Sequence, residues 1–202
     1  LLVERGAKLE LADYANSTPL MYAVHFGDIE IVKFLIEKGA NINHRDNNDI
    51  SPFIIAVEHN NVEMAFLLMD KGVEVKASAK YPKMDPLAYA IINDNKDLAK
   101  LIVKKGAEFT GPVLDALANR YKGKIENVSE LIVEAKKYGV DFIKLGQNYP
   151  SFLNMALARN SMVLIDLLID MGMDPNAYLN EGRTLLMDAV VLNNKEAVEL
   201  LL

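Results

Sequence analysis

Short apolar blocks that end in a basic residue and a glycine recur along the chain. Three of these blocks read Leu-Val-Glu-Arg-Gly-Ala, Leu-Ile-Glu-Lys-Gly-Ala and Ile-Val-Lys-Lys-Gly-Ala, and they end at Ala7, Ala40 and Ala107. An apolar stripe followed by a basic residue and Gly is typical of a helix C-terminus, because Gly supplies the left-handed residue after the last turn. The pattern therefore predicts a helix before each of these glycines.

Glycines in this position recur with a nearly constant period. Six of them are separated by 33, 33, 34, 33 and 33 residues: Gly6, Gly39, Gly72, Gly106, Gly139 and Gly172. An internal period of this length is the mark of a stacked repeat protein. Neighbouring repeats in such proteins build extended binding surfaces, so we expect a binding function rather than an active site.

A second motif follows about twelve residues after the glycines. It occurs three times, as Thr18-Pro19-Leu20, Ser51-Pro52-Phe53 and Asp85-Pro86-Leu87. Pro fits the first turn of a helix, where its missing N–H leaves no hydrogen bond unmade. A Ser, Thr or Asp directly before it can cap that helix. The motif therefore predicts that a helix begins at each of these prolines.

Two further positions keep the same phase. Four residues after the Pro position lies a small residue, at Ala23, Ala56, Ala90, Ala116, Ala156 and Ala189. Eight residues after it lies a residue that tolerates the left-handed conformation, at Gly27, Asn60, Asp94, Asn160 and Asn193. A buried Ala lets two helices approach closely, and a left-handed residue marks a tight turn. Each unit is therefore predicted to be a pair of short helices.

These positions resemble the ankyrin repeat family. The residues that match the family pattern in phase are Thr18-Pro19-Leu20, Ala23, Gly27, Ile31-Val32, Leu35, Gly39-Ala40 and Asn43. The His that the family usually has two residues after the Pro is absent from every repeat, which removes a local hydrogen bond without threatening the fold. The resemblance covers essentially the whole chain. It implies an all-α repeat solenoid of stacked helix-turn-helix units with β-hairpin fingers.

The resemblance divides residues 1–202 into one array. We expect a partial repeat, five full repeats and a truncated repeat at 1–12, 13–45, 46–79, 80–110, 111–145, 146–178 and 179–202. Because both ends fall within predicted helices, we expect a piece of a longer protein. The repeat at 111–145 has lost its finger and lengthened its helical pair. That change is either neutral drift in a tolerant loop or a functional change of curvature or of a partner platform.

The composition and the distribution of charge limit the classes of function that we expect. The net charge is −6, with 12 basic and 9 acidic residues at positions 80–145 and 10 basic and 19 acidic residues elsewhere. These charges are either solvated helix faces or a Lys-bearing central surface that meets an acidic partner. They are not the basic footprint of a nucleic-acid binder, and no apolar run approaches membrane-spanning length.

Candidate chemistry is sparse. The absence of Cys excludes disulfides, Cys-type zinc sites and Cys nucleophiles, without fixing the compartment. Neither a phosphate-binding loop nor a nucleophile elbow is present. His25 and His59 fall at nearly equivalent places in adjacent repeats, which makes them near neighbours. They are either a metal site with Asp46 or Glu58, or polar members of a contact patch. We expect the contact patch, with no catalytic residue, metal or cofactor.

In the ankyrin fold, the finger tips and the end of the first helix face the inner, concave side. The candidate partner-binding residues at these places are Tyr14, His25, Phe26, Arg45, Glu58, His59 and Tyr81. Aromatic residues and Arg are the types that most often carry binding energy. For Phe26 the alternative is packing against the helix of the next repeat, since large apolar residues usually lie in a core.

Fold and composition together predict an interaction scaffold. We expect a monomer that binds another protein through the concave face, without nucleic acid, a membrane segment or catalysis of its own. The fold part of this interpretation is analogy. The alternative is a targeting or regulatory module of a longer enzyme or effector whose active part lies outside this sequence.

Overall fold

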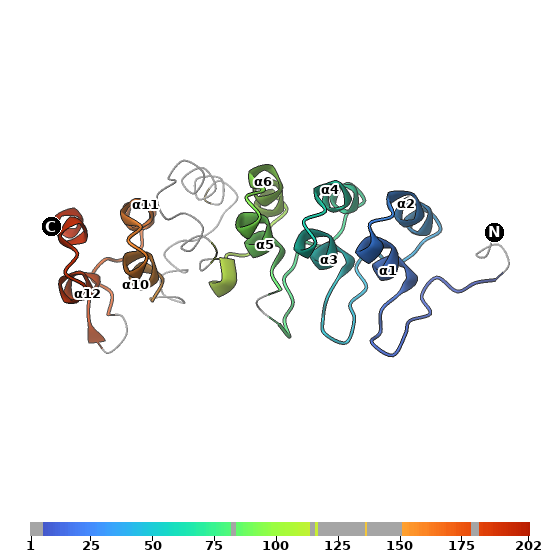
Figure 1. Cartoon of the computed structure of the whole chain (residues 1–202), viewed down its shortest axis with the longest axis horizontal. Helices are drawn as coiled ribbons and strands as arrows, with labels where there is room; N and C mark the ends of the chain where they lie inside the picture. The colour runs from blue at the N-terminus through green and yellow to red at the C-terminus, as the bar shows by residue number, and fades with distance from the viewer. Residues whose placement is uncertain (1–5, 82–83, 114–115, 117–135, 137–150, 179–181) are drawn as a thin grey trace. The chain divides into compact units, whose positions relative to one another are not determined.

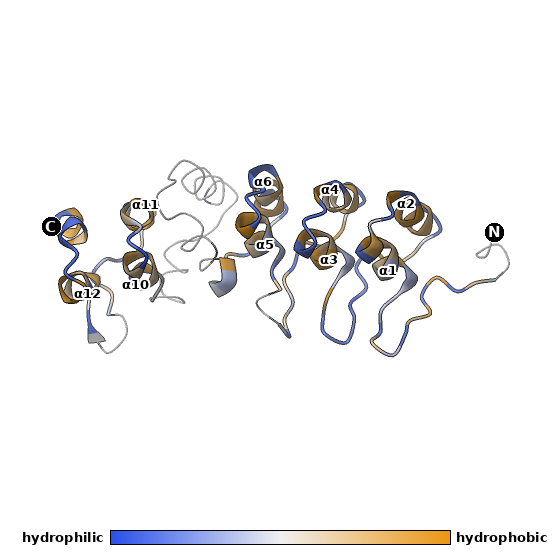
Figure 2. Cartoon of the chain, viewed as in Figure 1, coloured by the Kyte–Doolittle hydropathy of each residue, from blue (hydrophilic) through white to orange (hydrophobic). Residues whose placement is uncertain are grey.

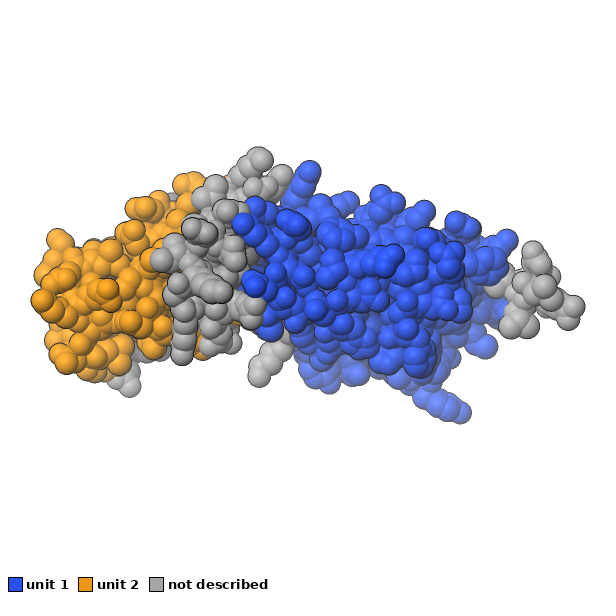
Figure 3. All heavy atoms as spheres, turned by 45° about the horizontal axis from the view of Figure 1, so that its top comes forward, with its two compact units in different colours: residues 1–107 blue, residues 108–202 orange. Residues whose placement is uncertain are grey.

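The computed structural model describes residues 6–81, 84–113, 116, 136, 151–178 and 182–202. The chain divides into two compact units, residues 1–107 (unit 1) and residues 108–202 (unit 2) (Figure 3). All regular secondary structure in the described part is helical. No helix among these residues is long and apolar enough to cross a membrane.

The described part of unit 1 contains three helix pairs arranged in two layers (Figure 1). The first helices of the pairs are α1 (Pro19–Phe26), α3 (Pro52–Glu58) and α5 (Pro86–Ile92). The second helices are α2 (Ile29–Glu37), α4 (Val62–Asp70) and α6 (Lys96–Lys104). Helix α3 packs between α1 and α5 in the first layer, and α4 contacts α6 in the second. The helical pairs therefore stack side by side, as the repeat period predicts.

Unit 2 shows the same arrangement in its described part. Its helices are α10 (Ser151–Ala158), α11 (Met162–Asp170), α12 (Leu185–Val191) and α13 (Lys195–Leu201). First helix α10 contacts first helix α12, and α11 contacts α13. Gly139 and most of the predicted irregular repeat at 111–145 lie outside the described residues.

The beginnings of the helices in unit 1 follow the predicted capping chemistry. The side chains of Thr18, Ser51 and Asp85 each accept a hydrogen bond from a backbone N–H two or three residues later. A Pro occupies the first turn of each of the three helices that follow. Capping satisfies backbone donors that a helix leaves unpaired at its start, so these helices begin where the sequence predicts.

The predicted left-handed positions are confirmed wherever they are described. Positive φ angles between 84° and 101° occur at Gly6, Gly39, Gly72, Gly106 and Gly172. The turns within helix pairs have φ between 50° and 77° at Gly27, Asn60, Asp94, Asn160 and Asn193. Only Gly, and to a lesser extent Asn and Asp, adopt this region at low cost, which explains why these residue types recur.

The core lies between the helices of successive pairs. Apolar residues dominate the helices, whereas the connecting turns are mostly polar (Figure 2). The small residue of the repeat is fully buried, with no exposed surface at Ala56, Ala90, Ala156 and Ala189. Its size permits the close contact of neighbouring first helices, because protein interiors are packed without spare volume.

Three fingers extend from the first-helix layer of unit 1, on the side away from the second helices (Figure 1). They comprise residues 13–17, 46–50 and 78–84, of which 82 and 83 are not described. The backbone N–H of Asp13 donates to the Ser17 carbonyl at 3.1 Å, and that of Asp46 donates to the Ile50 carbonyl at 3.1 Å. The described parts of the fingers are hairpin-like turns without assigned β-strands.

Candidate functional site

Three positions of each first helix in unit 1 stay accessible to solvent. They are the third, sixth and seventh residues after the initial Pro, which lie on one side of a helix. We call them the first-helix face, which consists of Tyr22, His25, Phe26, Ile55, Glu58, His59, Tyr89, Ile92 and Asn93. Every one of these residues is exposed or half-buried. The stacking of the helices brings nine side chains from three repeats into one surface.

Three rings meet at the α1 and α3 end of this face. The ring centroids of His25 and His59 are 4.7 Å apart, which confirms the predicted proximity of the two histidines. The ring of Phe26 lies edge-on to His25 at 5.2 Å. Phe26 is 78% exposed, so its side chain is open to solvent rather than packed in the core.

Glu58 provides the single formal charge in α1, α3 and α5 at neutral pH. Its Oε1 accepts a hydrogen bond from the Tyr89 hydroxyl of the next repeat at 3.3 Å. Burial, followed by the nearby charge of Glu58, raises the pKa of Tyr89 above its ordinary value. Tyr89 therefore keeps its proton, and its hydroxyl lies within hydrogen-bond distance of both Glu58 Oε1 and, at 3.1 Å, Met84 Sδ.

Asp13 joins the first finger to the first-helix face. Its Oδ2 accepts a hydrogen bond from the Tyr22 hydroxyl at 2.7 Å, and its Oδ1 accepts from the backbone N–H groups of Ala15 and Ser17. The bond from Ser17, and then the bond from Tyr22, lower the pKa of Asp13. Asp13 is therefore negatively charged at neutral pH.

Arg45 is engaged inside unit 1. Its guanidinium donates to the carbonyls of Asp49 at 2.8 Å and Lys76 at 3.2 Å, and it forms an ion pair with Asp49 Oδ1 at 3.2 Å. Burial would raise the pKa of Asp49, but a hydrogen bond from the Ala79 N–H and the charge of Arg45 outweigh that effect and lower it. Arg45 thus ties the second finger to the segment that leads into the third.

Two of the predicted partner-binding residues are tyrosines of the fingers. Tyr14 is fully exposed, and its carbonyl accepts a hydrogen bond from Asn47 Nδ2 of the next finger at 3.0 Å. Tyr81 is 45% exposed, with Lys80 Nζ 5.8 Å from its ring centroid. Lys80 Nζ also donates to the Asn47 carbonyl at 2.7 Å. The two bonds involving Asn47 join neighbouring fingers to one another.

Tyr22, Tyr89 and Asp13 are members of the site that the sequence prediction missed. A signal was present for the two tyrosines, since both stand three residues after a Pro that begins a first helix. Asp13 had no comparable signal, because its role depends on the distance between a finger and a helix.

The structure also bears on the alternative of a metal site. Within the described residues, no group of three or more His, Cys, Asp or Glu side chains is arranged to hold a metal ion. The contacts that His25 makes with His59 and Phe26 are contacts between rings. Such a surface can dock the side chains of another molecule.

The equivalent positions in unit 2 have a different chemistry. They are occupied by Met155, Ala158, Arg159, Asp188, Val191 and Leu192. Asp188 is buried and forms an ion pair with Arg183 Nε at 2.6 Å. Its second oxygen accepts a hydrogen bond from Asn154 of the preceding helix pair. Here the carboxylate is used inside the unit instead of facing solvent.

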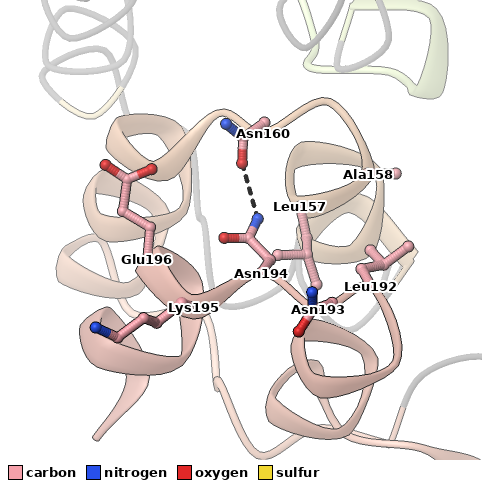
Figure 4. A pocket seen from close by; sticks show the side chains of 8 residues that line it. All are labelled: Leu157, Ala158, Asn160, Leu192, Asn193, Asn194, Lys195 and Glu196. Atoms are coloured by element: carbon pink, nitrogen blue, oxygen red, sulfur yellow. Dashed lines mark hydrogen bonds between the residues drawn. The ribbon is translucent and has the colours of Figure 1, made fainter.

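A hollow of about 460 Å³ lies beside these positions in unit 2 (Figure 4). It is lined by Leu157, Ala158, Asn160, Leu192, Asn193, Asn194, Lys195 and Glu196. Asn160 and Asn194 point toward each other, and Asn194 Nδ2 donates to Asn160 Oδ1 at 2.8 Å. The hollow is therefore a depression between two turns that are joined by a hydrogen bond.

Comparisons with known proteins agree with this architecture. A family model described as ankyrin repeats (3 copies) matches residues 1–46, 20–111 and 116–202. The crystal structure of the human ASB11 ankyrin repeat domain is similar, with a TM-score of 0.63 and 17% sequence identity, over 92% of this chain and 82% of that chain. A comparison with curated proteins gave no match. Since the family model covers nearly the full length, the chain belongs to the ankyrin repeat family.

Proposed function

We propose that this chain binds another protein through the first-helix face of unit 1 and the adjoining finger tips, as a monomer and without a catalytic step of its own. Ankyrin repeats are generally protein–protein interaction modules, and they typically bind rather than catalyse. The observation that carries the proposal is Phe26, which is 78% exposed and lies against the ring of His25, which in turn contacts the ring of His59.

Exposed aromatic rings favour binding for a physical reason. Covering a ring removes a large apolar area from water, and its few rotatable bonds keep the entropy cost of ordering it low. Tyr14, Phe26 and Tyr81 are all exposed. Truncation of an anchor residue of this kind typically lowers the binding free energy by about 2 kcal/mol or more.

The fingers add preorganisation to this surface. Asn47 of the second finger bonds to Tyr14 of the first, and Arg45, directly before the second finger, bonds to Lys76, which precedes the third. A surface that is already ordered loses less conformational entropy when it binds. In this proposal Arg45 acts by holding the fingers, whereas Tyr14, His25, Phe26, Glu58, His59 and Tyr81 meet the partner directly.

The test compares two exposed phenylalanines on different faces. The full chain serves as bait for cross-linking capture, and the affinity of the captured protein is then measured by calorimetry. Phe26→Ala should weaken binding at least about tenfold. Phe66→Ala, at a 39% exposed residue of second helix α4, should leave it unchanged. If Phe26→Ala keeps full affinity for the captured protein and Phe66→Ala loses it, the partner binds the second helices and not the first-helix face.

Light scattering of the free chain tests the monomer part of the proposal. We expect the mass of one chain, 22.5 kDa. A mass of two chains that returns to one in Phe26→Ala would instead identify the first-helix face as a self-association surface.

A further inference from the structure

The first-helix face carries one negative charge, that of Glu58, and a second carboxylate, that of Asp13, is joined to it through Tyr22. Helices α1, α3 and α5 contain neither Lys nor Arg. The lysines of the helical pairs lie on the second helices instead, at Lys33, Lys96, Lys100 and Lys104. The positive charges of the helix pairs are therefore kept away from Glu58.

The two carboxylates near this face are those of Asp13 and Glu58. Each accepts a hydrogen bond from a tyrosine hydroxyl, that of Tyr22 or that of Tyr89. Within the described part of the chain, neither carboxylate has an ion-pair partner. A carboxylate has about four lone-pair sites, so both can accept further hydrogen bonds.

Aromatic side chains occupy several positions of the first-helix face near Glu58. His59 follows it in the chain, and Tyr89 contacts it from the next repeat. The rings of His25 and Phe26 continue the surface toward α1. Aromatic faces attract cations, and a carboxylate beside them adds a direct charge interaction.

A partner that covers this face must supply a positive charge to Glu58. A partner that buries Phe26 and Tyr89 also removes water from Glu58, which lies between them in the register. A carboxylate that loses water without gaining a counter-charge strongly opposes binding. An acidic partner would add repulsion from Asp13 and Glu58. A purely apolar segment would leave Glu58 unpaired.

Resting on the proposed function above, we propose that the partner segment on this face presents an Arg side chain to Glu58, with apolar residues beside it that contact Phe26. Arg fits better than Lys because its planar guanidinium bonds a carboxylate through two N–H groups and stacks on aromatic rings. Asp13, near the first finger, attracts a second basic residue of the same segment.

The probe for this proposal is a library of random 12-residue peptides displayed on phage and selected against the immobilised full chain. The enriched peptides are synthesised, and their dissociation constants are measured by fluorescence anisotropy. We expect enrichment of Arg next to Leu, Ile or Phe. Glu58→Gln should weaken the enriched peptides at least about tenfold, whereas Glu63→Gln, at an exposed residue of α4, should not.

Glu58→Gln is a suitable variant because its amide oxygen can still accept the hydrogen bond from Tyr89. Unchanged circular dichroism would verify that the fold is intact. A charge exchange gives the sharper result. Glu58→Arg should abolish binding of an Arg-containing peptide, and replacement of that Arg by Glu in the peptide should restore most of the affinity.

The outcomes separate this inference from the proposed function. Enriched peptides that lose affinity in Phe26→Ala, lack basic residues and tolerate Glu58→Gln would overturn the Arg proposal and leave the binding face intact. Peptides that are insensitive to both variants, or a selection that enriches nothing, would count against both. Dependence on Glu58 without rescue by the exchanged charge would indicate a role of Glu58 in the fold.

Discussion

The two units place different chemistry at the same positions of the same repeat. In unit 1 the third position after the helix-initiating Pro carries Tyr22 and Tyr89, whose hydroxyls hold exposed carboxylates. In unit 2 that position carries Asp188, which is buried in an ion pair with Arg183. In unit 1 the sixth and seventh positions include the rings of His25, Phe26 and His59. At the end of α12 in unit 2 the same positions carry the aliphatic residues Val191 and Leu192.

This difference shows how a repeat fold separates stability from recognition. Stacking needs only the buried positions, so the accessible positions are free to differ from repeat to repeat. Unit 1 uses them for exposed aromatic residues, whereas unit 2 uses one of them for an internal polar network. Polar groups on unit 1 are therefore available to a partner, and Asp188 in unit 2 is not.

The largest expected effect is on binding. Phe26→Ala combined with His59→Ala should weaken the partner at least about a hundredfold, because two anchors of about 2 kcal/mol are lost. Val191→Ala combined with Leu192→Ala in unit 2 should change affinity less than threefold by the same calorimetric measurement. Equal losses in both double variants would show that recognition extends over both units.

The second-largest expected effect is on the packing of neighbouring first helices. Ala56→Leu should overpack the contacts of α3 with α1 and α5 and lower the free energy of unfolding by about 1–3 kcal/mol. Ala189→Leu should cost less, since α12 contacts only one other first helix within the described structure. Urea denaturation measures both. A larger cost at Ala189 would reverse the ranking.

The buried ion pair of Asp188 with Arg183 in unit 2 can be compared with the exposed hydrogen bond between Tyr22 and Asp13 in unit 1. Asp188→Ala removes the ion pair with Arg183 and the hydrogen bond from Asn154, and should lower the free energy of unfolding by about 1–3 kcal/mol. Tyr22→Phe removes only the exposed bond to Asp13 and should cost less than about 0.5 kcal/mol. Thermal unfolding of both variants checks the difference, and a neutral Asp188→Ala would contradict it.

The smallest expected effect concerns a hydrogen bond between turns. Asn95 Nδ2 donates to Asn60 Oδ1, and unit 2 has the same link on the wall of its hollow. Asn60→Gly should lower the free energy of unfolding by about 0.5–1 kcal/mol.

The first turn lacks this bond because it has Gly27, where an added Cβ would lie 3.3 Å from Asn61 Nδ2. Gly27→Asn should raise stability by a few tenths of a kcal/mol, since Asn tolerates the φ of 77° and gains the missing acceptor. Precise denaturation curves of the two variants measure both changes. A destabilised Gly27→Asn would show that the close contact with Asn61 outweighs the new bond.

The caps and turns were predictable because their interactions are local. Thr18 and Ser51 bond to backbone groups three residues away, and Gly39 and Asn60 are residue types that tolerate a positive φ at the turns that follow the helices. The period of 33 residues then fixed the stacking partners, so the proximity of His25 to His59 could also be predicted. Local chemistry repeated at a constant interval is enough to specify this fold.

Arg45 shows where the prediction from sequence ended. Its residue type indicated a partner contact, but its guanidinium bonds to carbonyls of Asp49 and Lys76. The identity of a side chain says which bonds it can make, whereas the distance between neighbouring fingers decides which bonds it does make. Whether Arg45 also contacts a partner stays a prediction.

The sequence by itself determined the repeat, its register and the residues at which the first helices of unit 1 begin. Only the tertiary structure decided how the accessible residues combine: Phe26 open to solvent, Tyr89 on Glu58, and Asp188 withdrawn into an ion pair. The physical reason is the distance along the sequence over which each interaction acts. Caps and turns act within three or four residues, but each of these combinations depends on side chains that only the stacking of separate repeats brings within contact distance.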